Sequence, residues 1–413
     1  MNVLTQPSVA VPAGQISRGK GSGHRASSGC TIESISTPEE LVRLGPEWRA
    51  LDAASGNGFP FRTYEWTQAW WQHLPQRRST VTDSLFVRAL RDPDGTLFAV
   101  APLLLTERPS IGPLRIRCLQ FIGPDGYITE MGGILCAQGR EEEAYRELAA
   151  HLQANCDRWD WMTWSGLMPE GTSGRAVQEV AQLEWLGRAP NYVLDLAPSW
   201  DEFRAGLPRN MKEALRKCYN APKRAGLAFN LEVAREPAQV KEALEEFFRL
   251  HKARAGLEGT VRHKDFFREP GTRNFLTEAC SVLAQRGATR VFSLKLGSAT
   301  VAARVGFVLG DTLYLHYSGY DPAFRAYSVM TATVAEAIRS AIGEGLRFVN
   351  LSMGNDVSKT RWRPREIGYG EALQISPRRS ARFWFRAYRL GYKTLHLPAV
   401  ERLASRYLWR RFD

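Results

Sequence analysis

The side chains most suited to chemistry are concentrated in the stretch HYSGYDPAFRAYS, which covers residues 316–328. His316 is a candidate general base, because imidazole titrates near neutral pH. Tyr320 could give a proton to a leaving group, and Asp321 could orient a substrate. Each also has a simpler interpretation, since a His can be satisfied in the core, a strand Tyr can pack, and an Asp before Pro often only forms a turn. We carry His316, Tyr320 and Asp321 forward as candidate catalytic residues.

The same stretch ends where a helix is expected to begin. The apolar stripe of VMTATVAEAIRSAI predicts a helix over about 328–344. A helix N-terminus presents unpaired backbone N–H groups and the positive end of the helix dipole, so it favours an anion. Ser328 is a candidate N-cap residue, and Arg325 lies just upstream, where a guanidinium can clamp a phosphate. The stretch therefore joins a candidate reaction end to a candidate anion-binding end.

The elements that must position these residues follow the same order in both halves of the chain. Each half reads as a strand, two helices, a meander of about three strands, a helix and a strand. We therefore predict an α/β fold made of two tandem units, each a mixed central sheet flanked by helices. The expected divisions are a disordered arm (1–29), two domains (30–190 and 191–377), and a basic aromatic tail (378–413).

Charge and cysteine spacing limit the classes of function. The net charge is +12, and residues 378–413 carry ten Lys and Arg against two acidic residues. Such a tail is either a helix packed on the body with its cations in solvent or a contact with an anionic membrane surface or with nucleic acid. The six cysteines form no C-x-x-C pair and no Cys/His cluster, so no metal site is expected. The apolar stretches are too short to span a membrane and the arm does not resemble a secretory signal, so we expect a cytoplasmic protein, with peripheral membrane contact as an option.

Three motifs in the second half carry a resemblance to a known family. They are YSGYDPAFRAYS (317–328), GLRFVNLSMGND (345–356) and SKTRW (358–362), and FRTYEWTQAWW (61–71) opens the first half in a similar way. Together they resemble the CelD/BcsL-like acetyltransferases, which have the GNAT fold and are related to the Fem-type peptidyltransferases. The resemblance implies transfer of an acyl group from acetyl-CoA or another acyl-CoA to an amine or hydroxyl acceptor. It implies no permanently bound cofactor, and it suggests a small-molecule or glycan acceptor in cell-envelope or exopolysaccharide biosynthesis.

The resemblance also implies a place for the donor. The pantetheine arm would pair with the strand that contains Tyr317, and the pyrophosphate would meet Arg325 and Ser328. Lys359 would neutralise charge on the donor or on the acceptor. The corresponding helix of the first half begins with Glu141, Glu142 and Glu143, which would repel a pyrophosphate. We therefore expect the donor in the second half only.

The first half is expected to shape the acceptor site through the segment 123–130. This gives Asp125 and Tyr127 as candidate substrate-binding residues, with Asn350 and Trp362 from the second half. Two alternatives stay open beside the acyl-CoA enzyme. A Fem-like aminoacyl-tRNA-dependent transferase would use its basic segments to bind RNA phosphates, although nucleic acid is not the expected partner. A non-catalytic partner in a polysaccharide-synthesis complex would bind membranes and release no thiol.

Overall fold

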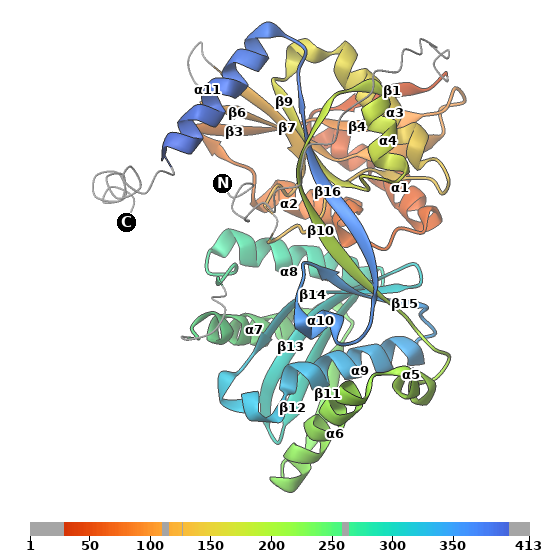
Figure 1. The fold of residues 1–413 in the computed structure, drawn as a ribbon, viewed down its shortest axis with the longest axis vertical. Helices are drawn as coiled ribbons and strands as arrows, with labels where there is room; N and C mark the ends of the chain where they lie inside the picture. Colours follow the sequence, from red (N-terminus) through yellow and green to blue (C-terminus); the bar gives the residue numbers. More distant parts are fainter. Residues whose placement is uncertain (1–28, 110–114, 126, 258–263, 396–413) are drawn as a thin grey trace.

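Helices packed on two β-sheets make up the protein, and the computed structural model describes residues 29–109, 115–125, 127–257 and 264–395 (Figure 1). The predicted arm, apart from Gly29, and the end of the predicted tail (396–413) lie outside the described residues. In chain order the first half contains β1 (Thr31–Ile35), α1 (Pro38–Ser55), α2 (Tyr64–His73), β2 (Arg77–Arg78), β3 (Val81–Leu85), β4 (Val87–Arg91), β5 (Leu97–Ala101), β6 (Leu103–Arg108), β7 (Ile116–Phe121), β8 (Leu135–Cys136), α3 (Glu141–Ala154), β9 (Trp161–Leu167), α4 (Thr172–Val180) and β10 (Leu183–Asp195).

The second half repeats the arrangement of the first. In both halves a helix links two strands that pair in parallel, since α3 lies between β7 and β9 in the chain just as α9 lies between β14 and β15. This confirms the predicted α/β fold, in which a mixed sheet is flanked by helices. The elements of the second half are α5 (Trp200–Gly206), α6 (Arg209–Arg224), β11 (Phe229–Ala234), α7 (Pro237–Ala255), α8 (Pro270–Gln285), β12 (Thr289–Leu296), β13 (Ala299–Leu309), β14 (Thr312–Tyr320), the 3-10 turn η3 (Pro322–Tyr327), α9 (Val329–Gly343), β15 (Phe348–Met353), α10 (Val357–Thr360), β16 (Arg365–Ile375) and α11 (Arg379–Leu395).

Two long strands join the halves into one sheet. The twelve-stranded sheet has the order β11-β12-β13-β14-β15-β10-β16-β9-β7-β6-β3-β2, and a separate four-stranded sheet has the order β1-β4-β5-β8. β10, which ends the first half, pairs with β15 of the second half, and β16, which ends the second half, pairs with β9 of the first. Figure 1 shows β10 and β16 running side by side between the halves. The expected boundary at 190/191 falls inside β10. Gly187 and Pro190 resemble linker residues in the sequence, but in the structure both are part of this strand.

A shared hydrophobic core holds the two halves on one face of the sheet. Trp66 of α2 is fully buried and makes edge contacts with Phe275 of α8 and Phe307 of β13, at ring-centroid distances of 5.0 and 5.8 Å. The opposite face of the second half is covered by α6 and α9, and that of the first half by α3 and α4. Edge contacts between aromatic rings contribute beyond the area they bury, so this cluster fixes the halves relative to one another.

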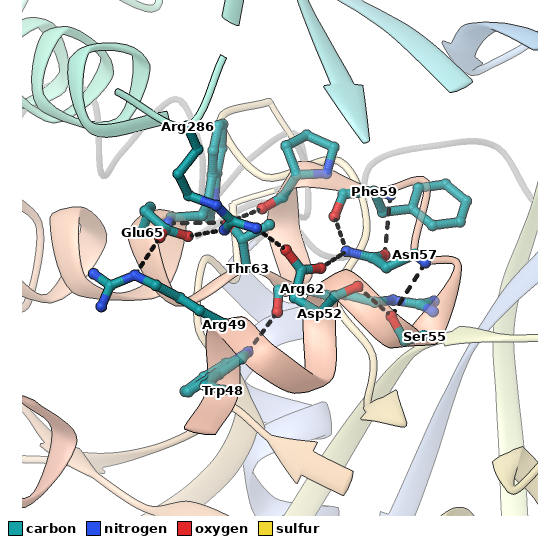
Figure 2. A network of polar contacts seen from close by, with 12 residues as sticks. Trp48, Arg49, Asp52, Ser55, Asn57, Phe59, Arg62, Thr63, Glu65 and Arg286 are labelled. Atoms are coloured by element: carbon teal, nitrogen blue, oxygen red, sulfur yellow. Dashed lines mark hydrogen bonds and ion pairs between the residues drawn. The ribbon is translucent and has the colours of Figure 1, made fainter. Parts of the chain in front are cut away.

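A buried ion-pair network reinforces that contact (Figure 2). The guanidinium of Arg286, at the end of α8, donates to Asp52 at 2.9 Å and to Glu65 at 2.8 Å, and both carboxylates belong to the first half. Arg49 donates to Glu65 at 2.7 Å, and the Asn57 amide donates to Asp52 at 2.8 Å. The side chains of Asp52 and Glu65 are only 4% and 0% exposed. Each buried carboxylate therefore has one partner from the second half, Arg286, and one from the first half. The first-half partner is Asn57 for Asp52 and Arg49 for Glu65.

The described part of the predicted tail is a helix on the body of the protein. Phe385 of α11 is buried against Trp161 of β9, with ring centroids 5.4 Å apart, and Arg389 forms an ion pair with Glu184 at 2.7 Å. This packing agrees with the simpler of the two interpretations of the tail. Within the described part of the chain, none of the helices combines the length and apolarity needed to cross a bilayer.

Replacement of Arg286 by Gln is expected to destabilise the protein by about 3 kcal/mol, because it removes a charge that two buried carboxylates require. Urea unfolding would measure the loss. Arg209→Gln is the matched control, since Arg209 pairs with Glu213 on the exposed face of α6 and such pairs contribute about 0.5 kcal/mol or less. Equal unfolding free energies for the two variants would contradict the assigned role of the network.

Candidate functional site

The strands β14 and β15 separate soon after they begin. They pair in parallel only over Thr312–Tyr314 and Phe348–Asn350, and β15 then continues along β10. A bulge in β14 accompanies the separation, because Arg304 lies opposite Ser318 while Gly306 lies opposite Leu315. The extra residue bends β14 away from its neighbour. The second half thus has diverging parallel strands directly before the start of α9.

A segment of the first half lies against the bulge. The carbonyl oxygen of Ile128 accepts a hydrogen bond from the Tyr317 hydroxyl at 2.5 Å and lies 3.1 Å from His316 Nε2. The exposed Tyr127 ring stacks on Phe266 of the second half, with centroids 4.6 Å apart. The segment 123–130, expected from the sequence to shape the acceptor site, therefore reaches the second half at the point where its strands diverge.

Glu130 is a carboxylate of this segment that contacts the strands directly. Its Oε2 accepts from the Tyr314 hydroxyl at 2.5 Å, and its Oε1 lies 3.6 Å from His316 Nδ1. Burial by itself would raise the pKa of Glu130, but His316, Lys359 and the Tyr314 hydrogen bond outweigh it and hold the pKa below its ordinary value. Glu130 is therefore a carboxylate at neutral pH. Sequence reasoning missed it, because its partners lie more than 180 positions away and the only signal was its place at the end of the segment 123–130.

Lys359 lies close enough to Glu130 for each charge to affect the pKa of the other group. Its ammonium donates to Ser352 Oγ at 2.9 Å and to the carbonyl oxygen of Met353, at the end of β15. The short helix α10 holds it there, since Asp356 caps α10 by accepting from the Ser358 N–H at 2.7 Å. Burial lowers the pKa of Lys359 to about 8. The site therefore contains a cation that gains and loses its proton near neutral pH.

The three candidate catalytic residues predicted from the sequence, His316, Tyr320 and Asp321, lie in surroundings that differ from one another. His316 is buried, with 2% of its side chain exposed, and it lies behind Glu130. Tyr320 is half-buried at the end of β14. The Asp321 carboxylate caps the turn η3 by accepting from the Ala323 N–H at 2.9 Å. His316 is thus placed to orient Glu130, and the structure gives Asp321 a turn-forming contact.

The candidate substrate residues are also distributed over several environments. Asn350 exchanges two side-chain hydrogen bonds with Asn191 of β10, at 3.0 and 2.9 Å, and Trp362 is buried in the core under α9. Asp125 Oδ1 accepts from the Ile128 N–H at 2.7 Å, and burial raises the pKa of Asp125 to about 6. Of the four, Tyr127 is the one whose side chain is largely exposed.

The start of α9 carries the candidate anion-binding residues. Ser328 occupies the N-cap position in a left-handed conformation (φ 55°), and its side chain makes no cap hydrogen bond. Arg325 is exposed in the turn η3, and Arg361 donates to Thr331 Oγ1 in the first turn of α9 at 3.0 Å. Arg361 was not among the residues predicted from the sequence. Two guanidinium groups therefore lie beside this helix start.

The equivalent place in the first half is occupied by the chain itself. β7 and β9 pair in parallel over Cys118–Gln120 and Trp161–Thr163, and beyond that point Gly132 lies between them. A Cβ on Gly132 would be 2.5 Å from Phe121 Cβ, and one on Gly166 would be 2.4 Å from the Gly132 carbonyl oxygen. The cavity that remains there is about 30 Å³. The start of α3 is also acidic, with Glu141, Glu142 and Glu143 in its first turn.

A cavity of about 580 Å³ lies elsewhere. It lies between α11 and the strands β10 and β16, where Phe385, Leu373 and Gln182 line it. The diverging strands of the second half, by contrast, bring together a carboxylate, a lysine with a lowered pKa and a helix start. The candidate functional site is therefore at these strands.

Comparisons with known proteins support a transferase function for the second half. Residues 209–362 match the sequence profile of the family described as "Acetyltransferase (GNAT) domain". No curated protein matches the chain. The crystal structure of FemX is similar with a TM-score of 0.57 at 12% identity, over 80% of this chain and 96% of that one, and this likeness establishes the fold alone.

Two further solved structures have lower scores. The C-terminal domain of a putative lysylphosphatidylglycerol synthetase from Agrobacterium fabrum has a TM-score of 0.48 at 12% identity, over 85% of this chain and 97% of that one. A tandem GNAT protein from the clavulanic acid biosynthesis pathway has a TM-score of 0.43 at 13% identity, over 84% and 100%. The more specific CelD/BcsL-like assignment stays a prediction.

Gly132→Ala is expected to destabilise the protein by about 1–3 kcal/mol, because the added methyl group has no space between the strands of the first half. Gly206→Ala is the control, since a Cβ on Gly206, at the exposed end of α5, has nothing within 4 Å. Thermal and urea unfolding would measure both. If Gly132→Ala were as stable as the control, the first-half strands would not be closed in the way described.

Proposed function

We propose that the protein is an acyltransferase that moves an acyl group from acyl-CoA to an amine or hydroxyl acceptor, with the donor bound in the second half only. The observation that carries the proposal is the pair Glu130 and Lys359 at the diverging strands β14 and β15, where each charge affects the pKa of the other group. In the first half the corresponding strands enclose Gly132. The resemblance to CelD/BcsL-like enzymes suggests that the acceptor belongs to cell-envelope or exopolysaccharide biosynthesis.

The donor would lie along the free side of β14. Its pantetheine arm would pair with the backbone near Ser318, where β15 no longer does so. Its pyrophosphate would meet the first turn of α9, where the helix dipole and the guanidinium groups of Arg325 and Arg361 favour negative charge. The acidic first turn of α3 would repel the pyrophosphate.

The chemistry follows from the protonation states of Glu130 and Lys359. Attack on a thioester requires that the acceptor lose a proton and that the departing thiolate gain one. Glu130 is ionised and can accept the proton, while His316 and Tyr314 fix its orientation. Lys359 is protonated below about pH 8. Its ammonium can give a proton to the departing thiolate or stabilise the oxyanion. Glu130 thus takes the role of base that the sequence suggested for His316.

A screen of acyl-CoAs by thermal shift, followed by release of free thiol, tests the function. Glu130→Gln is expected to lower turnover about 100-fold or more while donor affinity stays within about twofold, since loss of a general base affects the chemical step. Glu242→Gln, on the exposed face of α7, is the control. Stabilisation by no acyl-CoA, or normal turnover of Glu130→Gln, would contradict the proposal.

The pH dependence of turnover tests the role of Lys359 separately. If the protonated ammonium is required, the rate of thiol release falls as pH rises through about 8, which is the pKa of Lys359. In Lys359→Arg the guanidinium keeps its proton, so this fall is expected to disappear from the profile even where the rate is lower. A descending limb that remains near pH 8 in Lys359→Arg would assign it to another group.

A second candidate, aminoacyl-tRNA-dependent transfer, is favoured by one observation. The helix α6 packs beside α9, with Met211 Sδ accepting a contact from Arg361 at 3.1 Å, and its outer face is basic. The exposed cations of that face are Arg209, Arg216, Lys217, Lys223 and Arg224. RNA that co-purifies with the protein and dissociates steeply with salt would support this candidate, whereas saturable acyl-CoA binding supports the first.

A further inference from the structure

Arg304 of β13 is a buried cation without a complete set of partners. It is 9% exposed, its Nε makes no hydrogen bond, and the contact recorded for its Nη2 is a long one of 3.4 Å to the Leu315 carbonyl oxygen. No carboxylate lies within ion-pair distance of it among the described residues. A buried guanidinium in this state is costly, because neither its charge nor its donors are compensated.

Arg88 of β4 shows how the same fold satisfies a buried arginine that has no ligand. Arg88 is 2% exposed, and its Nε donates to His151 at 3.3 Å. Its Nη1 donates to the Val87 carbonyl oxygen at 2.9 Å, and its guanidinium lies 3.5 Å from the centre of the Phe86 ring. Burial lowers the pKa of both Arg88 and Arg304 to about 10. The difference is therefore in their contacts, because the Nε of Arg88 is paired and the Nε of Arg304 is not.

Other cations surround Arg304. Arg304 lies opposite Ser318 in the sheet, and Ser318 Oγ accepts from Arg254 of α7 at 2.7 Å. The charge of Arg254 helps to lower the pKa of Arg304. The charge of Arg304 in turn helps to lower the pKa of Lys359. The carboxylates whose charge acts on Arg304 are Glu130 and Asp356.

The geometry points to a binding site for a compact oxyanion, a carboxylate or a phosphate, that is carried by the acceptor and held by Arg304. Arginine binds such groups through two parallel N–H bonds, and the unpaired Nε supplies one of them. The inference rests on the proposed function for the origin of the anion. The donor's phosphates are assigned to the start of α9, whereas Arg304 lies near Glu130 and Lys359, where the acceptor's nucleophile must be. The acceptor is thus an amine or alcohol with an acidic group close to its nucleophile.

Anion binding can be measured without any acyl donor. Titration calorimetry with inorganic phosphate and with acetate, against chloride at equal ionic strength, would give saturable binding for at least one oxyanion. Arg304→Gln is expected to weaken that binding about tenfold or more, as loss of a charged hydrogen-bonding group does. Arg88→Gln, the buried arginine of the first half, is the matched control and is expected to leave it unchanged. The stronger of the two anions indicates whether the acceptor's group is a phosphate or a carboxylate.

Two comparisons keep the inference separate from the proposed function. With the wild-type protein, thiol release should be at least about tenfold faster with an amino acid or an amino-alcohol phosphate than with the matching amide or alcohol, and phosphate should compete with that acceptor. If Arg304→Gln does not fold, anion binding is measured with Arg304→Lys instead, together with the competition between phosphate and the acceptor in the wild-type protein. Binding of neither anion, equal binding by Arg304→Gln, or equal rates with charged and neutral acceptors would overturn the inference and leave acyl transfer standing. Arg304-dependent anion binding without cleavage of any acyl-CoA would support the anion site and count against the proposed function.

Discussion

The pairing of β10 with β16 is the constraint on which the rest of the molecule depends. The two strands are antiparallel over ten partnered positions, from Leu183 with Gln374 to Val193 with Arg365. Because β10 also pairs with β15 and β16 with β9, a strand of each half pairs with a strand of the other. A two-domain chain normally allows relative motion, whereas a continuous ladder does not. The buried contacts of Arg286 and Trp66 then fix the same orientation on one face of the sheet.

This rigid arrangement explains why two copies of one unit can differ in use. The segment 130–132 takes part in both, since Glu130 reaches the diverging strands of the second half while Gly132 fills those of the first. Closing one unit therefore positions a carboxylate in the other. Displacement of the segment would at once open the first half and remove Glu130 from Lys359. The acidic start of α3 and the uncapped start of α9 also favour an anionic donor in the second half rather than in the first.

Local patterns were enough to predict most of the fold, and less of the site. The apolar periods of α7, α9 and β12–β14 are regular, and acidic or capped starts such as Glu141–Glu143 are visible in the chain. β10 was not predicted, because its Gly187 and Pro190 favour a linker and its partners are distant in sequence. Glu130, Arg304 and Arg361 were missed for a related reason. Their chemistry comes from burial and from neighbours that are distant in the sequence, which a local pattern does not contain. Lys359, by contrast, stood in a motif.

Hydrogen exchange of the backbone amides, followed by mass spectrometry with and without an acyl-CoA, tests the central claim that one half alone binds the donor. Exchange reports local opening segment by segment, so both units are observed in one experiment. We predict slower exchange over 316–331 and 352–359 when the donor is present, and unchanged exchange over 118–123 and 161–166. Protection of the first-half segments, alone or together with those of the second half, would contradict the account.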